Sequence, residues 1–264
     1  MRRFIPNRFL IVRHGESIWN QDSKFTGWTN IPLSDGGREE ARRISRTLMQ
    51  HDLVPNVIFT STLHRCIETS SIVKKEANMG DDVPLLTSWR LNEKHYGTLE
   101  GIPRQYIRDK YGEKFTKLLR TSYTMRPPFE QESPYKNEYP IYRNCYFETI
   151  KNGESKENVL DRLLPYYEND ILYTMTEQKF PLIVTHKHTA RVLMKHLLKM
   201  DDQAFESYEF PSKTVVLINL DDNLQYDNHI EFPYVKMPVA NAPASVDNTS
   251  PSSDDSSKKA AQTV

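Results

Sequence analysis

Short apolar runs without alternating polar residues constrain the fold of this chain more than any other feature. They cover residues 9–12, 57–60, 181–185 and 215–220, and residues 85–86 fit a further, shorter strand. Strands that are buried on both faces have this pattern, which is typical of parallel sheets covered by helices. Between the runs, residues 38–50 carry Ala41, Ile44 and Leu48 at helical spacing, and further helical segments follow the runs at 57–60 and 181–185. The alternation predicts an α/β fold, with a mostly parallel sheet flanked by helices.

Composition divides the chain into one domain and a tail. The 264 residues can bury a sizeable core, and residues 1–236 are predicted to form a single domain. Within it, residues 120–150 are rich in Pro, Tyr, Glu and Asn without a clear period, so we expect an irregular insert over the open end of the sheet. Residues 237–264 are mainly small or polar and contain no aromatic residue. They would bury too little surface to offset the entropy of ordering, which predicts a disordered C-terminal tail.

The balance of charges argues against several classes of partner. The chain has 35 basic and 35 acidic residues, whereas general nucleic-acid or membrane-surface binders usually carry an excess of one sign. Its two cysteines, Cys66 and Cys145, are too few for a disulfide framework and lack zinc-ligand spacing. No stretch approaches the roughly 20 apolar residues of a membrane span, and no signal-peptide core follows the basic start. We therefore expect a cytoplasmic protein that binds neither nucleic acid nor a membrane.

Polar residues that suit phosphate chemistry follow four of the predicted strands. They are Arg13, His14 and Gly15 after the first strand, Ser61 and Arg65 after the second, Arg90 and Glu93 after the third, and His186 after the fourth. In open α/β sheets, ligands bind outside the carboxyl ends of the strands. We therefore expect these side chains to meet at one edge of the sheet. Gly15, which has no side chain, would let the backbone approach a phosphate closely.

This set of side chains suits phosphoryl transfer. The neutral imidazole of His14 can attack phosphorus and carry the group as a phosphoramidate. The guanidinium groups of Arg13 and Arg65 can hold the equatorial oxygens while charge spreads over them. The imidazole of His186 can donate a hydrogen bond to the same charge. Glu93 can give a proton to the leaving oxygen and take one from the acceptor. This chemistry requires no metal.

Several longer segments resemble the cofactor-dependent phosphoglycerate mutases. They are residues 10–20 (LIVRHGESIWN), 25–29 (FTGWT), 88–97 (SWRLNEKHYG) and 163–166 (LLPY), within a resemblance that spans residues 8–222. Arg-His-Gly alone is typical of the broad histidine phosphatase superfamily, whereas the Trp-Arg-Leu-Asn-Glu sequence at 89–93 is specific to the mutase branch. The resemblance implies 2,3-bisphosphoglycerate as a phosphoryl primer, no metal, and a small phosphorylated substrate. It also implies a homo-oligomer.

The same resemblance implies roles for individual residues. His14 corresponds to the phosphorylated histidine, His186 to the second histidine and Glu93 to the proton donor. The positions that match substrate or phosphate ligands are Arg13, Ser17, Asn20, Thr26, Gly27, Arg65 and Tyr96. Arg104 stands in the place of a family lysine, and Arg120 aligns with the first of two paired arginines.

The chain departs from the mutase pattern around the substrate. Thr121 replaces the second paired arginine, and losing one charge-assisted hydrogen bond of about 1.5–3 kcal/mol weakens binding more than tenfold. Lys187 and His188 replace a Gly-Asn pair, so that the lysine either contacts a phosphate or blocks the pocket. Lys94 and Lys213 replace the usual Arg and Gly.

These observations predict a phosphoglycerate mutase of glycolysis, which interconverts 3-phosphoglycerate and 2-phosphoglycerate through phosphorylated His14. The sequence leaves two alternatives open. One is a phosphatase or a bisphosphoglycerate mutase-like enzyme that acts on an altered phosphorylated substrate. The other is a low-activity paralogue that binds anions or a protein partner, which the changes at Thr121, Lys187 and His188 favour.

Overall fold

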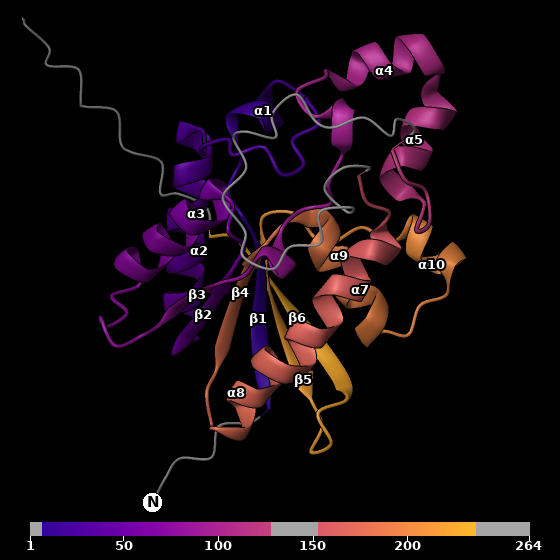
Figure 1. Cartoon of the computed structure of the whole chain (residues 1–264). Helices are drawn as coiled ribbons and strands as arrows, with labels where there is room; N and C mark the ends of the chain where they lie inside the picture. The colour runs from indigo at the N-terminus through magenta and orange to yellow at the C-terminus, as the bar shows by residue number, and fades with distance from the viewer. Residues whose placement is uncertain (1–6, 128–152, 236–264) are drawn as a thin grey trace, which may run out of the picture.

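The computed structural model describes residues 7–127 and 153–235, which contain a six-stranded sheet in the order β3-β2-β4-β1-β5-β6 (Figure 1). The strands are β1 (Arg8–Arg13), β2 (Val57–Thr60), β3 (Leu85–Thr87), β4 (Pro181–Thr185), β5 (Thr214–Leu220) and β6 (Tyr226–Pro233). β4 pairs in parallel with β1 and β2, and β2 pairs in parallel with β3. β5 runs antiparallel to β1 and β6. The predicted α/β fold with a mostly parallel sheet is confirmed.

The central strand β1 is buried on both faces, as its apolar sequence predicts. The side chains of Phe9, Leu10, Ile11 and Val12 are all 0% exposed. Phe9 and Ile11 pack in the core on one face of the sheet, and Leu10 and Val12 pack in the core on the other. One strand contributes to both cores because successive side chains point to opposite faces.

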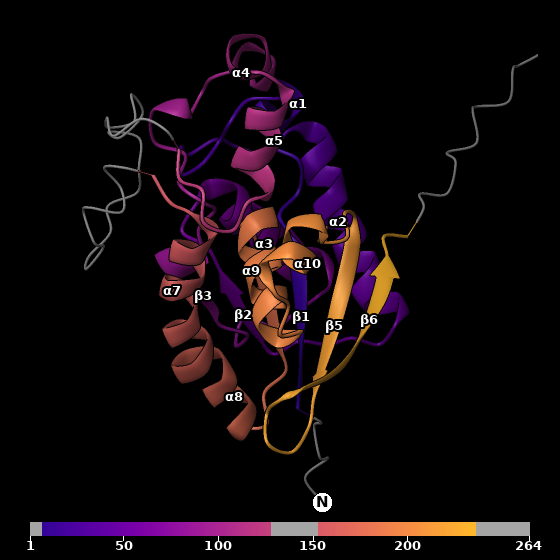
Figure 2. The same ribbon diagram turned by 90° about the vertical axis from the view of Figure 1, so that its right-hand side faces the viewer.

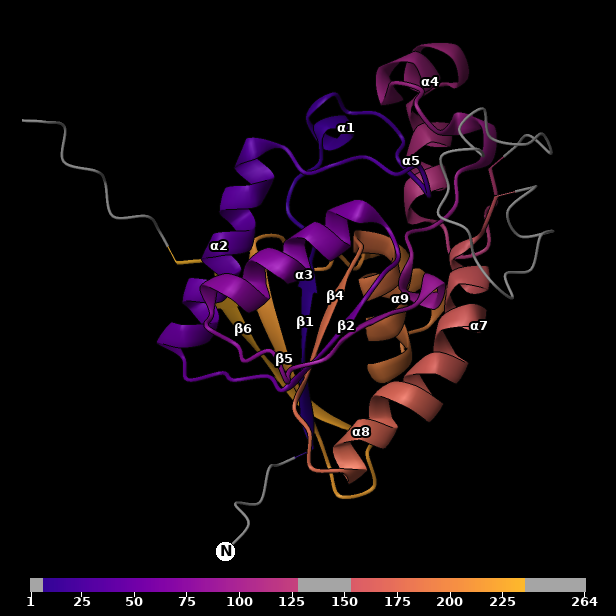
Figure 3. The ribbon, with the colours of Figure 1, turned by 60° about the vertical axis from the view of Figure 1, so that its left-hand side comes forward.

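Helices cover both faces of the sheet. They are α1 (Ile18–Gln21), α2 (Asp35–Gln50), α3 (His64–Glu76), α4 (Arg104–Tyr111), α5 (Glu113–Thr121), α7 (Lys156–Tyr166), α8 (Leu172–Thr176), α9 (Lys187–Leu197) and α10 (Asp202–Ser207), with short 3₁₀ turns at Trp89–Leu91 and Gly97–Leu99 and a π turn at Tyr167–Ile171. α2 and α3 lie over one face, and α7, α8 and α9 lie over the other (Figure 1 and Figure 3). Ile44 and Val73 pack on the first face, and Val159 and Val192 pack on the second.

The starts of two helices place residues at the carboxyl edge of the sheet. α2 begins at Asp35, three residues before the predicted segment. Ser34 caps it, since Ser34 Oγ accepts a hydrogen bond from the N–H of Gly37 at 3.1 Å and satisfies a donor of the first turn. α9 begins immediately after β4, with His186 at its N-cap position. Because no loop separates β4 from α9, the residues around His186 are held firmly at the end of the strand.

Strand β6 is absent from the sequence-based prediction. Its eight residues include Asp227, Asn228, His229 and Glu231, and none of the eight is buried. It pairs only with β5, at the edge of the sheet. An edge strand that buries little apolar surface does not show the hydrophobic pattern on which the prediction depends.

α1, α4 and α5 lie beyond the carboxyl ends of the parallel strands, at the top of the molecule in Figure 2. Of the insert expected at 120–150, Arg120 and Thr121 end α5, residues 122–127 have no regular structure, and the rest lies outside the described residues. The tail predicted for 237–264 also lies outside them. In the part of the chain that the structure describes, no helix is long and apolar enough to cross a membrane.

Candidate active site

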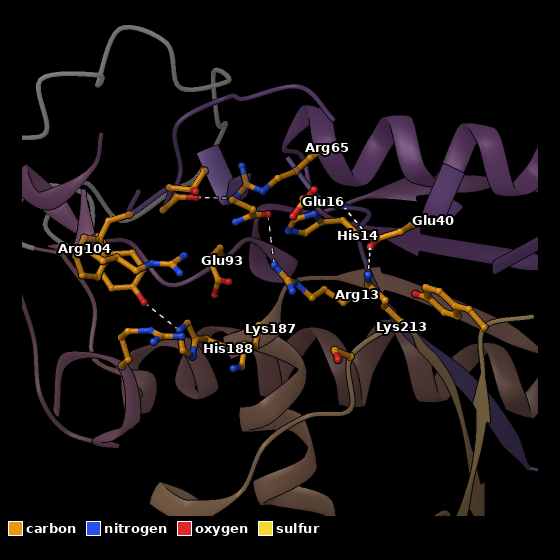
Figure 4. Close-up of a pocket in the computed structure, with 18 residues that line it drawn as sticks. Arg13, His14, Glu16, Glu40, Arg65, Glu93, Arg104, Lys187, His188 and Lys213 are labelled. Carbon is orange, nitrogen blue, oxygen red and sulfur yellow. Dashed lines mark hydrogen bonds and ion pairs between the residues drawn. The ribbon is translucent and has the colours of Figure 1, made fainter. Parts of the chain in front are cut away.

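A cavity of about 280 Å³ opens at the carboxyl edge of β1, where the sequence predicts a site (Figure 4). Twelve of the fourteen predicted site residues line it, namely Arg13, His14, Asn20, Thr26, Gly27, Arg65, Glu93, Tyr96, Arg104, Arg120, Lys187 and His188. Ser17 and His186 are close to it but do not line it. The other lining residues are Glu16, Phe25, Glu40, Ser212, Lys213 and Tyr234.

His14 directly follows β1, and a local hydrogen bond fixes its ring. Its Nδ1 lies 2.6 Å from the carbonyl oxygen of Gly15, which can only accept, so Nδ1 carries the proton. Nε2 then has the lone pair that can attack phosphorus. Burial, with the nearby charges of Arg65 and Arg13, lowers the pKa of His14 well below its ordinary value. The imidazole is therefore neutral near pH 7, which is the form required of a nucleophile.

His186 packs edge-on against His14, with the ring centroids 4.8 Å apart. Its side chain is 0% exposed, and its Nε2 lies 2.8 Å from Ser61 Oγ and 3.3 Å from Cys66 Sγ. Burial, followed by the charge of Arg65, lowers the pKa of His186 well below its ordinary value. The structure brings the two histidines together but does not put His186 on the cavity surface. Its hydrogen bond to the phosphate stays a prediction.

Two guanidinium groups stand beside His14. Arg65, on α3, is 1% exposed and donates to the carbonyl oxygens of Gly27 and Thr29 at 2.7 and 3.0 Å. These bonds fix the plane of its guanidinium group at the cavity wall. Arg13 donates from Nη2 to Asn20 Oδ1 at 3.4 Å, and its buried Nε has no partner among the described residues. A buried donor without a partner on a cavity wall suits an anion-binding site, since buried polar groups are normally hydrogen-bonded.

Glu93 places a carboxyl group in the same cavity. Its Oε1 accepts a hydrogen bond from the N–H of Lys94 at 2.8 Å. Its backbone oxygen accepts from Trp28 Nε1 at 2.6 Å and from Arg162 Nη2 at 3.0 Å, which fixes the position of the residue. Burial raises the pKa of the Glu93 carboxyl, against the opposing effects of the Lys94 N–H and the nearby arginines. A carboxyl group with a raised pKa suits general acid catalysis.

Basic side chains line the far end of the cavity. Arg104 begins α4, Arg120 lies near the end of α5, and Lys187 begins α9. In Figure 4, Arg104 lies on the opposite side of Glu93 from His14. The cavity therefore has positive charge at both ends, which suits a ligand with two anionic groups.

Tyr96 and His188 connect two walls of this far end. The Tyr96 hydroxyl lies 2.9 Å from His188 Nε2, and His188 Nδ1 is buried without a partner among the described residues. Burial lowers the pKa of His188 well below its ordinary value, and nearby cations such as Arg191 act in the same direction. His188 is therefore a neutral hydrogen-bonding group, and the surrounding positive charge favours this form.

Lys187 lies in the wall of the cavity. Its side chain is 28% exposed, and its Nζ pairs with Glu209 Oε2 at 2.5 Å. Because its amine is paired with Glu209, both outcomes left open by the sequence, contact with a phosphate and blocking of the pocket, stay predictions.

The chain matches a known family over most of its length. The family model of the histidine phosphatase superfamily (branch 1) matches residues 9–139 and 129–226. The chain belongs to the histidine phosphatase superfamily.

A 2,3-bisphosphoglycerate-dependent phosphoglycerate mutase of Rhodococcus jostii (strain RHA1) is 36% identical over 218 residues, covering 82% of this chain and 86% of the relative. A protein of the same name from Haemophilus influenzae (strain PittGG) is 33% identical over 222 residues, 83% of this chain and 97% of the relative. Within the superfamily, the chain is a divergent member of the phosphoglycerate mutase family.

Solved structures share the fold of this chain. A mycobacterial glucosyl-3-phosphoglycerate phosphatase in complex with VO3 superposes with a TM-score of 0.64 and 19% sequence identity, covering 84% of this chain and 96% of that chain. The likeness shows the fold. The superfamily and the residues around His14 together identify an enzyme of phosphoryl transfer or hydrolysis.

The glycine of the Arg-His-Gly sequence is required by packing. A Cβ atom at Gly15 would overlap the carbonyl oxygen of Gly37, at the start of α2. The structure thus gives a different reason for Gly15 from the predicted approach of a phosphate. Ser17 also has a local role, because it caps α1 and its Oγ accepts from the N–H of Asn20 at 3.3 Å. Its contact with substrate stays a prediction.

A buried ion pair behind the cavity was not predicted from the sequence. Arg162, on α7, pairs with both oxygens of Glu154 at 2.7 and 3.1 Å. It also donates to the carbonyl oxygens of Arg90 and Asn92 at 2.6 and 2.8 Å, and so holds the loop that ends at Glu93. The sequence contained no signal of this ion pair, because arginine and glutamate side chains usually lie on the solvent-exposed surface of a protein.

Glu40 joins two segments at the near end of the cavity. Its Oε2 accepts from the N–H of Glu16 at 2.9 Å, and its Oε1 pairs with Lys213 at 3.2 Å. Lys213 has a φ of 54°, a conformation that favours glycine. The glycine that the mutase family usually has at this position could have indicated the turn from the sequence. No sequence feature indicated that Glu40 would join the two segments.

Proposed function

We propose that the chain is a phosphoglycerate mutase that interconverts 3-phosphoglycerate and 2-phosphoglycerate, with 2,3-bisphosphoglycerate as phosphoryl primer. The observation that carries the proposal is the orientation of His14. Its Nδ1 is bound to Gly15, so that Nε2 is the nucleophilic atom beside Arg13, Arg65 and Glu93. Relatives of that name at 33–36% identity support the choice of substrate. The proposed activity belongs to glycolysis, in the cytoplasm.

Each proposed transfer uses His14 and Glu93 together. Phosphorylated His14 gives its phosphoryl group to the free hydroxyl oxygen of 3-phosphoglycerate, the N–P bond breaks, and Glu93 takes the hydroxyl proton. His14 Nε2 then attacks the phosphorus at the other carbon, the P–O bond breaks, and Glu93 returns the proton to the leaving oxygen. Arg13 and Arg65 hold the oxygens of the transferred group in both steps. The cycle ends with 2-phosphoglycerate and with His14 phosphorylated again.

The residues of the cavity fit the primer. It carries two phosphates and a carboxylate, and the cavity has guanidinium groups at the His14 end and three basic residues, Arg104, Arg120 and Lys187, at the other. In the proposed binding mode, the phosphate to be transferred lies at His14 and the remaining anionic groups lie at the far end. No metal is needed for the proposed chemistry.

The proposal is tested by covalent labelling and turnover. Incubation with 2,3-bisphosphoglycerate should add one acid-labile phosphate, measured by intact mass, and His14→Ala should remain unlabelled. Purified protein should convert 3-phosphoglycerate to 2-phosphoglycerate faster after this priming. The proposal fails if wild-type protein stays unlabelled under conditions that label a control mutase.

The second candidate is a phosphatase that acts on a different phosphorylated acid. It is favoured by the altered far end, where Lys187 and Thr121 stand in place of the usual residues. In this case water would attack phosphorylated His14 in place of a substrate hydroxyl. The same assay separates the candidates, because a phosphatase labels His14 but releases inorganic phosphate without forming the isomer.

We also propose, from membership of the mutase family, that the chain forms a homo-oligomer. Light scattering of the purified full chain, at several concentrations after size-exclusion chromatography, measures its mass in solution. A mass of 30.9 kDa at every concentration, which is the mass of one chain, would contradict the proposal.

A further inference from the structure

A second cavity adjoins the far end of the first. Its volume is about 90 Å³, which equals that of roughly three liquid waters and suits one anionic group. Three residues line both cavities, namely Arg104, Arg120 and Lys187. The two cavities thus share three cationic side chains in their lining.

The second cavity has more positive charge than its own carboxylates balance. It adds Arg108 and Lys117 to the three shared basic residues, and its only acidic lining residues among those described are Glu113 and Glu209. Glu113 lies 3.8 Å from Arg108, and Glu209 pairs with Lys187. No carboxylate among the described residues pairs with Arg104, Arg120 or Lys117.

The unbalanced charges are close enough to affect one another. Burial lowers the pKa of Arg104, and the next largest cause is the like charge of Arg120. Two neighbouring guanidinium groups carry like charges and repel each other. A bound anion between them would relieve the repulsion, and their planar forks suit an oxyanion.

Thr121 leaves room for such an anion. It lies in the wall of the second cavity, and its Oγ1 donates to the carbonyl oxygen of Lys117 within α5 at 3.1 Å. The small side chain is therefore turned back onto its own helix. A longer side chain at this position would fill the space that the structure shows.

Glu209 forms an ion pair with Lys187, one of the cations that a bound anion would contact. It is 58% exposed, whereas its partner Lys187 is 28% exposed. An exposed carboxylate is weakly held by an ion pair, because water solvates it almost as well. A ligand anion that enters the second cavity can therefore replace Glu209 as the partner of Lys187.

We propose that the second cavity is an anion subsite continuous with the phosphate pocket, and that it binds the distal phosphate or carboxylate of a phosphorylated ligand longer than phosphoglycerate. The proposal rests on the proposed function only in placing the first phosphate at His14. It extends the ligand class from three-carbon phosphates to longer ones with an anionic group at each end.

Calorimetric titration with a ladder of alkanediol bisphosphates, from two to eight carbons, tests the subsite without turnover. The measured quantity is the affinity of each bisphosphate relative to that of the two-carbon compound. We expect this ratio to rise at least about tenfold at the chain length that reaches the second cavity. A matched series with a terminal carboxylate in place of the second phosphate shows which anion is preferred. A flat profile in both series would overturn the proposal.

Three variants and one control locate the effect. Lys117→Ala should lower the ratio at least about fivefold, and Thr121→Leu should lower it by filling the cavity. Glu209→Gln should raise it, since Lys187 then has no competing carboxylate. Lys114→Ala, an exposed lysine of α5 outside both cavities, should leave it unchanged. Equal ratios for Lys117→Ala and Lys114→Ala would contradict the subsite, even if the longer ligands bind more tightly.

The two proposals can fail separately. If 3-phosphoglycerate is not isomerised but the ratio rises with length and falls in Lys117→Ala, the mutase function is wrong and the subsite stands. If 3-phosphoglycerate is isomerised and the affinity ratio does not change with chain length, the mutase function stands and the subsite is wrong. Circular dichroism and thermal melting of each variant show whether it is folded before its affinity is compared.

Discussion

At the residue scale, burial tunes the protonation of the groups that carry the proposed chemistry. It lowers the pKa of His14 and of His186, and it raises the pKa of Glu93. Burial disfavours the charged form of each group, so the histidines are kept neutral while the carboxyl group retains its proton to a higher pH. A neutral nucleophile beside a protonated acid is the combination that phosphoryl transfer from a sugar-acid oxygen needs.

We expect Glu93→Gln to lower kcat for mutase turnover by about 10²- to 10⁴-fold, because an amide cannot donate or accept the proton. KM should change much less, since the amide keeps the size of the side chain. Wild-type kcat should also fall as pH drops below the raised pKa of Glu93, because a protonated carboxyl group cannot take the hydroxyl proton of 3-phosphoglycerate in the first transfer, and this limb should be missing from the variant. Steady-state kinetics between pH 5 and 9 measure both effects. A variant with wild-type kcat would show that another group moves the proton.

A second prediction at this scale concerns Lys156, which is 0% exposed and donates to the carbonyl oxygen of Ser122 at 2.8 Å. Burial lowers the pKa of Lys156 to about 6, whereas the pKa of an unfolded lysine is about 10.4. At pH values between these two pKa values, the unfolded chain binds one proton more than the folded chain does. The free energy of unfolding therefore rises with pH in this range. The slope for one group is at most about 1.4 kcal/mol per pH unit.

Urea unfolding at pH 7, 8 and 9 tests this linkage. Lys156→Met should remove the contribution of this residue, so the free energy of unfolding of the variant should rise less with pH than that of the wild type. Some slope should remain, because burial also lowers the pKa of Lys94 to about 8. Lys114→Met is the exposed control and should keep the wild-type slope. Parallel pH profiles for wild type and Lys156→Met would show that the buried amine stays protonated.

At the element scale, the site depends on close junctions between elements. The loop after β1 packs on the first turn of α2 through Gly15 and Gly37, and β4 runs into α9 without a loop. Both junctions fix a histidine, His14 in the first case and His186 in the second. Local backbone packing therefore sets the distance between the two imidazole rings.

The two glycines in the first turn of α2, Gly36 and Gly37, give a matched pair of variants. A Cβ atom at Gly37 would overlap the carbonyl oxygen of Glu16, whereas one at Gly36 would meet nothing closer than 3.7 Å. We expect Gly37→Ala to lower the free energy of unfolding by about 2 kcal/mol or more and to reduce labelling of His14. Gly36→Ala should be neutral or stabilising by up to about 1 kcal/mol, since alanine is the better helix former. Equal stabilities of the two variants, measured by urea unfolding, would contradict the close contact.

At the scale of the whole molecule, the charge is balanced but unevenly distributed. The 35 basic and 35 acidic residues cancel, yet the lining of the cavity includes six basic residues against three acidic ones. A cleft with an excess of positive charge attracts an anionic ligand even when the net charge of the whole protein is zero. The acceptance of anionic substrates is therefore a property of how the fold distributes charges.

We expect kcat/KM for 3-phosphoglycerate to fall by roughly threefold or more between 20 and 300 mM KCl, because salt screens the field of the cavity. Lys187→Met should lower kcat/KM at low salt and make its salt dependence less steep. Lys114→Met removes the same charge from the exposed surface of α5 and should leave the dependence unchanged. Stopped assays at constant pH measure these slopes. If kcat/KM does not depend on salt, the cavity field does not guide the substrate.

The sequence alone determined the fold class and the centre of the site. Uninterrupted apolar runs predicted β1, β2, β4 and β5, because a strand buried on both faces cannot alternate with polar residues. The topological rule that strand ends share an edge placed His14, Arg65 and Glu93 together, and the structure confirms this. Both follow from local sequence pattern and from general rules of α/β sheets, which do not depend on contacts between distant residues.

The tertiary structure decided what depends on contacts between distant residues. Strand β6 exists because β5 offers an edge to pair with, although its own sequence is polar. Arg162 is a buried support of the Glu93 loop because Glu154 and four carbonyl oxygens surround it. The ion pair of Lys187 with Glu209 and the second cavity beside it likewise arise where α5, α9 and the segment after α10 meet. Such features have no local signature, because their free energy comes from desolvation and pairing between segments that are remote in the chain.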